Sequence, residues 1–235
     1  MSGDPSASVV EQTEVAAAPL VPEIRLHLLR ADSSLWRAFA EDSEAAGTRR
    51  PYWAFAWSGG QALARYVLDH RELVAARRVL DFAAGGGIAA IAAAQAGASQ
   101  VTATEIDPVA LAAIALNARL NGVEVAMACE DLIYSPNRGW DVVLAGDVWY
   151  ETRLARHGLL WLQTLAAEGV LVLTADPGRH YSPSQGVEEL ARYRARSVPD
   201  LEHPNLQEVC VYRVLPPQVG PVGNRSHEPV GHPSA

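Results

Sequence analysis

Five acidic side chains stand where five predicted strands end, and this placement is the feature of the sequence that could do chemistry. Parallel strands of an open α/β sheet end at one edge, and ligands bind in the crevice outside that edge. A rim of carboxylates suits a ligand that carries hydroxyl groups and positive charge. Each acid alone could equally cap a helix, so the set of five favours a ligand site. The five are Asp81, Glu105, Asp131, Asp147 and Asp176.

A turn of small residues follows the first of these acids. Residues 79–88 predict a short buried strand, a turn and the start of a helix. Gly85 and Gly87 have no Cβ, so the backbone can turn sharply and a ligand can approach the helix N-terminus closely. The spacing Gly85-x-Gly87-x-x-Ala90 also satisfies the dinucleotide pattern. The turn therefore indicates a nucleotide without deciding which one.

The position of Asp81 favours S-adenosylmethionine over a dinucleotide. A carboxylate directly before the turn would repel a pyrophosphate, whereas it complements a sulfonium or an amino group. The helix N-terminus past Gly87 can meet the carboxylate of the same ligand. Glu105 is placed for the ribose hydroxyls and Asp131 for the adenine amino group. Because Glu105 would also serve the ribose of NAD, an NAD-linked oxidoreductase or a non-catalytic binding domain stays an alternative.

An aromatic segment, residues 51–60, precedes a predicted helix and ends in a pair of glycines. Trp57 stands where the chain turns into that helix, and we predict that it contacts the ligand, since an indole face attracts a cation or stacks on a base. Trp53 is assigned to the substrate side of the site. Packing of an N-terminal cap onto the sheet would account for Trp53 equally well.

The elements that must position these residues alternate between strand and helix. Strands are predicted near residues 79–82, 100–104, 123–129, 141–146, 170–175 and 207–215, and helices near 88–96, 108–120, 153–167 and 187–196. This alternation predicts an α/β, Rossmann-like, doubly wound and mostly parallel sheet. The last strand follows a loop rather than a full helix, so an antiparallel edge strand is expected there.

The 235-residue chain is long enough for one such domain. The composition of residues 1–22 predicts a disordered leader, because acidic residues, Ser, Ala and Pro occur there without a signal-peptide pattern. Residues 23–215 form the predicted domain, with a small cap of strand and helix over residues 23–57. Residues 216–235 predict a disordered tail, and its two histidines are too few for a metal site.

Composition narrows the partners and the compartment. The net charge of −8 disfavours a nucleic-acid binder, since phosphate backbones attract basic surfaces. No apolar run reaches 18 residues, so no membrane span is expected. Cys129 and Cys210 fit buried thiols in a reducing cytoplasm better than a disulfide framework.

Three motifs together carry a family resemblance. They are the segment 51–60 with Pro51-Tyr52-Trp53-Ala54-x-x-Trp57-Ser58-Gly59-Gly60, Asp147-x-x-Tyr150 after the fourth strand, and Asp176-Pro177-Gly178-Arg179 after the fifth. With the glycine turn, they make the chain resemble the class I, seven-β-strand, S-adenosylmethionine-dependent methyltransferases. More narrowly, residues 22–216 resemble the electron-transfer-flavoprotein β-subunit lysine methyltransferases. The resemblance implies a seven-stranded sheet, S-adenosylmethionine as cofactor, no metal, and a protein lysine as acceptor.

The same resemblance implies roles for the residues after the fourth and fifth strands. Asp147 would orient the arriving ammonium and relay its proton to water, and Tyr150 would help by hydrogen bonding or by its ring face. Gly146 is assigned to cofactor binding, and Asp176 and Arg179 to the substrate side. A small-molecule acceptor on the same fold is the main alternative to a protein lysine. Val148 and Trp149 do not match the two prolines typical of nucleobase amino-methyltransferases.

One position departs from the superfamily pattern. Ala83 stands where the first glycine of the G-x-G-x-G turn is usual. Alanine disfavours a positive φ angle, so we expect this position to be tight rather than left-handed. Glu105 stands where Asp is more usual, which lengthens the reach without changing the chemistry.

Overall fold

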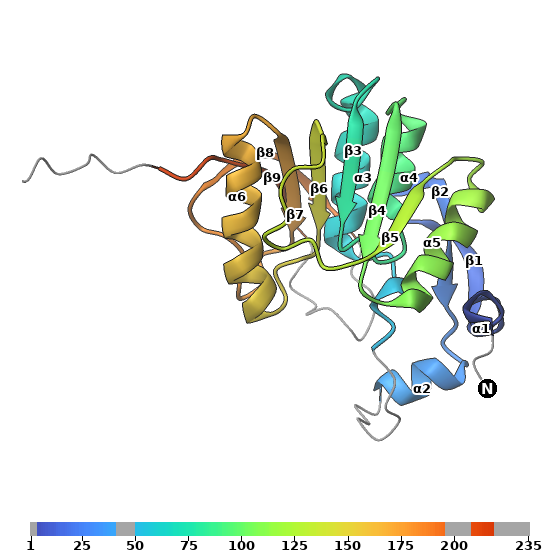
Figure 1. Ribbon diagram of the computed structural model, residues 1–235. Coiled ribbons are helices and arrows are strands. Elements are labelled where there is room, and N and C mark those ends of the chain that lie inside the picture. Colours follow the sequence, from blue (N-terminus) through green and yellow to red (C-terminus); the bar gives the residue numbers. More distant parts are fainter. Residues whose placement is uncertain (1–3, 41–49, 196–207, 219–235) are drawn as a thin grey trace, which may run out of the picture.

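The computed structural model describes residues 4–40, 50–195 and 208–218. Its centre is a seven-stranded sheet with the order β5-β4-β3-β6-β7-β9-β8 (Figure 1). The parallel strands are β3 (Arg78–Phe82), β4 (Gln100–Glu105), β5 (Ala126–Cys129), β6 (Val142–Gly146) and β7 (Leu171–Asp176). β9 (Glu208–Val214) pairs antiparallel with β7, and β8 (Val187–Arg194) pairs antiparallel with β9. The predicted mostly parallel, seven-stranded sheet with an antiparallel edge is confirmed.

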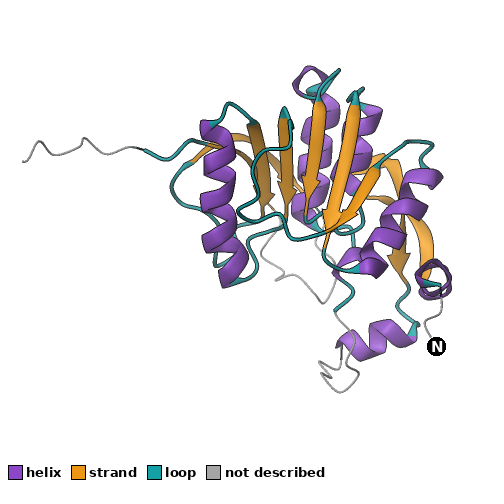
Figure 2. Ribbon diagram, in the orientation of Figure 1, coloured by secondary structure: helices purple, strands orange, loops and turns teal. Residues whose placement is uncertain are grey.

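Helices cover both faces of this sheet, as Figure 2 shows. Helices α3 (Ser58–Asp69), α4 (Ile88–Gln95) and α5 (Pro108–Leu120) lie against one face, and α6 (Leu159–Ala167) lies against the other. Neighbouring residues of a strand point to opposite faces, so Val142 joins the core under α3 and α4 whereas Val143 joins the core under α6. Two-sided burial explains the continuous apolar runs of the central strands.

The chain winds outward from β3 through β4 to β5 and then returns to β6 on the other side of β3. Ligands of doubly wound sheets bind at this reversal of strand order, outside the carboxyl ends. The reversal therefore places the ends of β3 and β6 side by side, with Asp81 and Asp147 at or just beyond them.

The N-terminal segment differs from the predicted disordered leader. Residues within 5–22 form helix α1 (Pro5–Gln12), strand β1 (Thr13–Ala18) and the start of β2 (Val21–Leu29), which pairs antiparallel with β1. Asp4 caps α1 by accepting from the Ser6 N–H at 3.0 Å, and Pro5 begins the helix. Val9 is fully buried in a cluster with residues of α5. Burial against a distant helix orders a segment whose composition alone suggested disorder.

The cap is completed by helix α2 (Ser34–Ala40) and a 3₁₀ helix over Tyr52–Ala54. A second 3₁₀ helix spans Arg71–Leu73, and a π-helical turn over Leu154–Gly158 leads into α6. Most of the predicted tail lies outside the described residues. Among the described residues, no helix combines the length and apolar character needed to cross a bilayer.

Two further expectations are wrong. Residues 187–194 form strand β8 rather than a helix, because pairing with β9 overrides the helix propensity of the Glu-, Leu-, Ala- and Arg-rich sequence. Cys129, expected to be buried, is exposed at the end of edge strand β5, and Cys210 is half-buried.

Candidate active site

A cavity of about 460 Å³ lies at the carboxyl ends of strands β3, β4 and β6. Its size is that of pockets that hold small ligands and cofactors. Nine of the twelve predicted site residues line it. They are Trp57, Asp81, Gly85, Glu105, Asp131, Gly146, Asp147, Tyr150 and Arg179. The fold therefore gathers residues from well-separated stretches of the chain around one space.

The glycine turn forms one wall of the cavity. Gly85 and Gly86 line it, and Gly86 was not singled out from the sequence. Gly87 has φ +80° and directly precedes α4 as its N-cap. A Cβ there would meet the side chain of Ile114 at 3.2 Å, so this glycine allows close packing rather than lining the cavity. Ala83 has φ +52°. The expectation that Ala83 avoids the left-handed region is wrong, and the alanine holds a conformation that glycine adopts more easily.

Asp81 is buried between this turn and the start of α4. Its carboxyl oxygen accepts from the Ala90 N–H at 2.8 Å, so it satisfies a backbone donor of the first helical turn. Burial raises the pKa of Asp81 to about 7, against the opposing effect of that hydrogen bond. A cation arriving in the cavity would favour the ionised carboxylate.

Glu105, the last residue of β4, and Asp131, two residues past the end of β5, both line the cavity. Glu105 accepts from the Gly85 N–H at 2.8 Å and from the Ile106 N–H at 3.0 Å. Burial raises the pKa of Glu105 in spite of these bonds. A carboxylate has about four acceptor sites, so Glu105 can support the turn and still accept from ligand hydroxyls.

Asp131 is fixed by a backbone N–H group and by an arginine. It accepts from the Ile133 N–H at 3.1 Å and forms an ion pair with Arg153 at 2.5 Å. Burial acts to raise the pKa of Asp131, but Arg153 and the Ile133 N–H together hold it below its ordinary value. Asp131 is therefore a fixed anion on the cavity wall.

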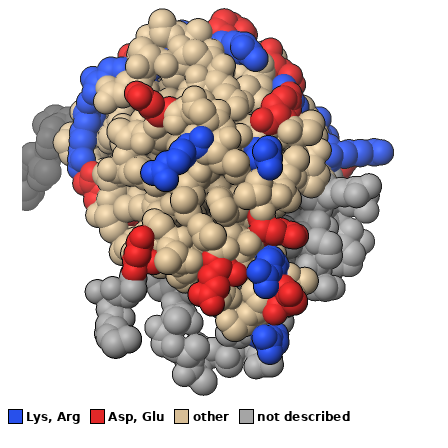
Figure 3. All heavy atoms as spheres, turned by 90° about the vertical axis from the view of Figure 1, so that its right-hand side faces the viewer, with Lys and Arg blue, Asp and Glu red and all other residues tan. Residues whose placement is uncertain are grey.

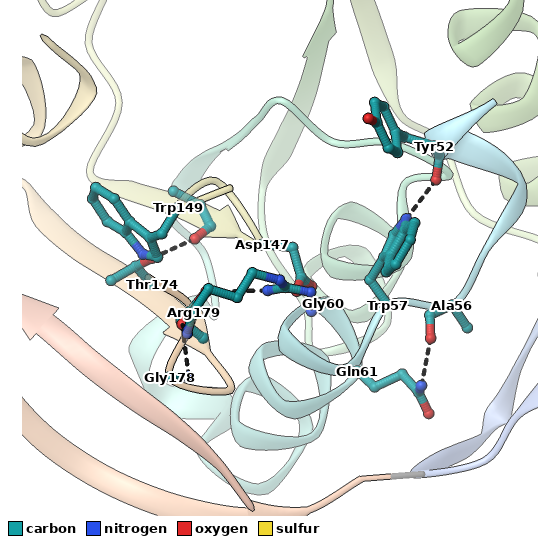
Figure 4. Close-up of polar contacts among 12 residues, drawn as sticks. Tyr52, Ala56, Trp57, Gly60, Gln61, Asp147, Trp149, Thr174, Gly178 and Arg179 are labelled. Carbon is teal, nitrogen blue, oxygen red and sulfur yellow. Dashed lines mark hydrogen bonds and ion pairs between the residues drawn. The ribbon is translucent and has the colours of Figure 1, made fainter. Parts of the chain in front are cut away.

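Asp147 adopts φ +39° just after β6, which turns its carboxylate toward the start of α3. One oxygen accepts from the Gly60 N–H, and the other forms an ion pair with Arg179 Nη1 at 2.6 Å (Figure 4). Burial raises the pKa of Asp147, and Arg179 acts against this rise. The cavity wall thus carries a largely buried carboxylate that is paired with the Arg179 guanidinium.

Asp176 lies behind this pair and does not line the cavity. It is fully buried, accepts from the N–H groups of Gly178 and Arg179 at 2.7 Å each, and contacts Arg179 Nη1 at 3.1 Å. The assignment of Asp176 to a substrate-facing position is therefore wrong. Asp176 shapes the loop after β7 and orients Arg179 toward Asp147.

The stretch that carries Asp147 and Tyr150 is anchored by Trp149, one of the two residues between them. Trp149 is fully buried, and its Nε1 donates to Thr174 Oγ1 at 2.9 Å; Thr174 in turn donates to the Ala145 carbonyl at 2.6 Å. This anchoring leaves Tyr150 46% exposed at the cavity mouth. The Asp-x-x-Tyr spacing places a carboxylate inside and a phenol at the entrance.

Aromatic rings surround the entrance. Trp57 Nε1 donates to the Tyr52 carbonyl at 2.7 Å, and the Tyr52 ring lies 5.5 Å from that of Tyr150 and 6.1 Å from that of Trp57. Burial raises the pKa of Tyr150, which keeps its phenol neutral. Tyr52 was missed by sequence reasoning, although it lies in the aromatic segment that drew attention to Trp57.

Trp53 does not face the cavity. It is 4% exposed and packs in a cluster with Val9, Ala110 and Ala113. Its assignment to the substrate side is therefore wrong, and the alternative of a packed aromatic holds. Gln61, also missed, donates to the Ala56 carbonyl at 2.6 Å and so holds the segment directly before Trp57 (Figure 4).

The donor set fits a cationic nucleoside better than a pyrophosphate. Asp81 occupies a backbone donor at the start of α4 with a carboxyl group, and Glu105 occupies the Gly85 N–H. These are donors that would cradle a phosphate in a dinucleotide site. Thr104 Oγ1, near the end of β4, is buried and has no hydrogen-bond partner among the described residues. The described residues contain no cluster of His, Cys, Asp and Glu suited to a metal ion.

Comparisons with known proteins agree with this reading. Residues 61–146 match the sequence profile of the ribosomal protein L11 methyltransferase family. The chain is 38% identical over 218 residues to the electron transfer flavoprotein β-subunit lysine methyltransferase of Xenopus laevis, covering 90% of this chain and 87% of that protein. The human protein of the same name is 39% identical over 176 residues, covering 74% of this chain and 66% of that protein.

A solved structure of magnesium protoporphyrin IX methyltransferase from Synechocystis, with bound S-adenosylmethionine, matches at 14% identity. It has a TM-score of 0.49 and covers 79% of this chain and 99% of that one.

The doubly wound seven-stranded sheet and the acidic cavity at its carboxyl edge are those of a seven-β-strand methyltransferase. The chain belongs to the electron transfer flavoprotein β-subunit lysine methyltransferase family. The resemblance drawn from the sequence motifs is confirmed.

Proposed function

We propose that this protein transfers a methyl group from S-adenosylmethionine to the ε-amino group of a lysine in a protein acceptor. The observation that carries the proposal is the Asp147 carboxylate, whose side chain is only 14% exposed and is paired with Arg179, in the same cavity that the exposed ring of Tyr150 lines. Membership of a lysine methyltransferase family supports the same reaction.

For the cofactor, we assign the nucleoside to the wall made by the glycine turn, Glu105 and Asp131, and the cationic part to Asp81. S-Adenosylmethionine, when bound, supplies a methyl group on a positively charged sulfur. Asp81 would stabilise that charge, and the pKa of about 7 means that the carboxyl group loses its proton readily when a cation approaches. The chain otherwise supplies proximity and electrostatic orientation.

For the acceptor, Asp147 is placed to receive a lysine ammonium. A free lysine has a pKa of about 10.4 and must lose a proton before its nitrogen can attack. Asp147 retains acceptor sites besides those used by Gly60 and Arg179, so it can orient the ammonium and pass a proton to water. Arg179 favours the ionised form of Asp147, which burial alone would disfavour.

The aromatic entrance suits the same acceptor. Tyr52 and Tyr150 present aromatic rings to the cavity that Asp147 also lines. Ring faces attract an ammonium group, while their apolar surface accommodates the methylene stem of a lysine. We assign Tyr150 to the alignment of the amine and Tyr52 to the entrance.

We further propose that the acceptor is the β-subunit of an electron transfer flavoprotein, which is the acceptor in the names of the relatives. The proposal includes a cytoplasmic location and no nucleic-acid partner. Two free cysteines support the first. The net charge of −8 supports the second, as does the face in Figure 3, where acidic and basic side chains are interspersed rather than gathered into a basic patch.

The test measures transfer of tritiated methyl groups to a purified electron transfer flavoprotein, with the modified residue identified by mass spectrometry. All 19 basic side chains of this sequence are arginines, so methyl-lysine cannot come from the enzyme itself. Asp147→Asn keeps an acceptor for the Gly60 N–H but loses the charge. We expect transfer to fall at least about 100-fold, with calorimetric affinity for S-adenosylmethionine within about threefold.

Asp176→Asn is the matched control, because Asp176 is also buried and also contacts Arg179 but lies outside the cavity. We expect this variant to keep transfer within about tenfold of wild type. Full activity of Asp147→Asn would refute the role of Asp147. Labelling of a small molecule in a lysate, with no labelled protein, would refute the protein acceptor.

A further inference from the structure

Asn117 joins the glycine turn to the N-terminal hairpin made of β1 and β2. Its side chain on α5 is fully buried. Its Nδ2 donates to the Gly86 carbonyl at 2.9 Å, and its Oδ1 accepts from the His27 N–H of β2 at 2.8 Å. One amide group thus bonds simultaneously to the cavity wall and to a strand 90 residues away in the sequence.

The turn is clamped from the opposite side as well. A Cβ built on Gly86 would lie 2.7 Å from the Trp53 carbonyl oxygen and 3.5 Å from Asn117 Nδ2. The Gly86 backbone is therefore held between the Trp53 backbone and the Asn117 amide. Gly85, the neighbouring residue, lines the cavity and donates its N–H to Glu105.

We propose that Asn117 is a positioning residue for cofactor binding. It fixes the Gly86 peptide, and through it the turn and the Glu105 carboxylate, in the arrangement that accepts the nucleoside. This inference rests on the proposed binding of S-adenosylmethionine at the turn. It assigns to α5 and the N-terminal hairpin a part in ligand binding, although Asn117 itself does not line the cavity.

The turn needs an outside contact because its own residues do not hold it in one conformation. Gly85 and Gly87 have positive φ angles, and glycine exchanges such conformations easily for others, whereas Ala83 holds a positive φ that alanine disfavours. The turn residues by themselves therefore do not fix the conformation of the turn. Buried backbone carbonyls need a partner, and Asn117 supplies one for Gly86. Removing the amide would leave the carbonyl unpaired and the turn free to rearrange.

The same helix offers a matched control. Asn121, the residue that caps the C-terminal end of α5, lies one helical turn beyond Asn117 and docks β2 in the same way. It accepts from the Arg25 N–H at 3.0 Å and donates to the Arg25 carbonyl at 2.7 Å. The helical i, i+4 spacing of about 6 Å matches two residues of a strand. Asn121 also donates to the Asn117 carbonyl at 2.7 Å. Within the part of the chain that the structure describes, it forms no hydrogen bond with the turn, so it reports docking of the hairpin onto the end of α5 without a direct link to the turn.

The experiment compares Asn117→Ala and Asn121→Ala by calorimetry with S-adenosylmethionine and by hydrogen exchange of the unliganded protein. We expect Asn117→Ala to raise the dissociation constant about tenfold or more and to speed exchange of the Gly87 N–H, which donates to Ala84 within the turn. Asn121→Ala should change the dissociation constant by less than about threefold. Thermal unfolding checks that both variants are folded.

Asn117→Asp serves if the alanine variant fails to fold. It keeps the volume and the acceptor for His27, while an ionised carboxylate, measured at about pH 8.5, has no proton for Gly86. Weakened binding by this variant supports the proposal. Wild-type affinity in Asn117→Ala or Asn117→Asp, or equal losses in Asn117→Ala and Asn121→Ala, overturns it. A wild-type protein that binds no S-adenosylmethionine would instead reject the proposed function.

Discussion

The acidic residues at the strand ends differ in environment, although their sequence positions look alike. Burial raises the pKa values of Asp81, Glu105 and Asp147, whereas an arginine helps to hold the pKa of Asp131 below its ordinary value. Asp176 is closed off from the cavity by its own loop. A carboxyl group whose charge is disfavoured by burial gains most from a cationic ligand. Asp81, Glu105 and Asp147 are therefore the residues where we expect ligand binding and protonation to be coupled.

Asp81 should make stability depend on pH. Its folded-state pKa of about 7 lies above the ordinary value of 3.8, so the unfolded chain loses this proton first as the pH rises. As the pH rises from 3.8 to about 7, the contribution of Asp81 to the free energy of unfolding falls, and above a pH of about 7 that contribution is lost completely.

Asp81→Asn keeps an acceptor for Ala90 and removes the ionisation. We expect its free energy of unfolding in urea to exceed that of wild type by at most about 4 kcal/mol at pH 8 and to match wild type near pH 4. The same variant should bind S-adenosylmethionine more weakly. A difference between the two proteins that does not vary with pH would contradict the assignment.

At the scale of elements, the site depends on how closely helix α3 approaches the ends of β6 and β7. A Cβ on Gly59 would lie 2.7 Å from both the Ala175 carbonyl oxygen and Asp147 Cγ. A Cβ on Gly146 would lie 3.1 Å from the Gly60 Cα. Glycines at this contact bring the Gly60 N–H within reach of Asp147. The Gly59-Gly60 pair, noticed in the sequence only as the end of an aromatic segment, thus positions the proposed catalytic carboxylate.

Gly59→Ala should separate α3 from the two strands. We expect a loss of about 1–3 kcal/mol in the free energy of unfolding, because the added methyl group meets backbone and a buried side chain, together with reduced methyl transfer. Gly158→Ala is the control: Gly158 has helical φ and ψ, and a Cβ there meets no atom within 4 Å. We expect the free energy of unfolding of Gly158→Ala to exceed that of wild type by about 0.5–1 kcal/mol. Equal effects of the two substitutions on denaturation curves would argue against the close-approach explanation.

At the scale of the whole molecule, the first residues of the chain belong to the folded domain. α1 packs on α5, and the β1–β2 hairpin is hydrogen-bonded to the same helix through Asn117 and Asn121. Leu26 of β2 lines the cavity directly. The N-terminal segment therefore stabilises the half of the molecule that carries the glycine turn.

Two neighbouring valines of α1 test this arrangement. Val9 is fully buried and Val10 is 54% exposed. Val9→Ala should lower the free energy of unfolding by about 1–3 kcal/mol, because two methyl groups leave a packed cluster. Val10→Ala should stay within about 0.5 kcal/mol of wild type. Indistinguishable denaturation midpoints for the two variants would mean that α1 does not pack as described.

Much of the architecture could be predicted because its signals are local. Apolar runs between turns indicate the buried parallel strands, and Asp107-Pro108 predicts the start of α5 with the cap that the structure contains. β8 could not be predicted, since its sequence favours a helix and only the hydrogen bonds of β9 decide otherwise. The exposure of Cys129 likewise depends on the position of β5 at the edge of the sheet.

By itself, the sequence determined the class of chemistry. Acidic residues after successive strands, a carboxyl group directly before the glycine turn, and the Asp147-x-x-Tyr150 spacing all depend on residue types a few positions apart. Only the tertiary structure decided which residues share the cavity. It turned Trp53 and Asp176 away, brought Tyr52 to Tyr150, and set Asn117 between the turn and β2. The reason is physical: these contacts join segments far apart in the chain, and their geometry follows from how helices and strands pack.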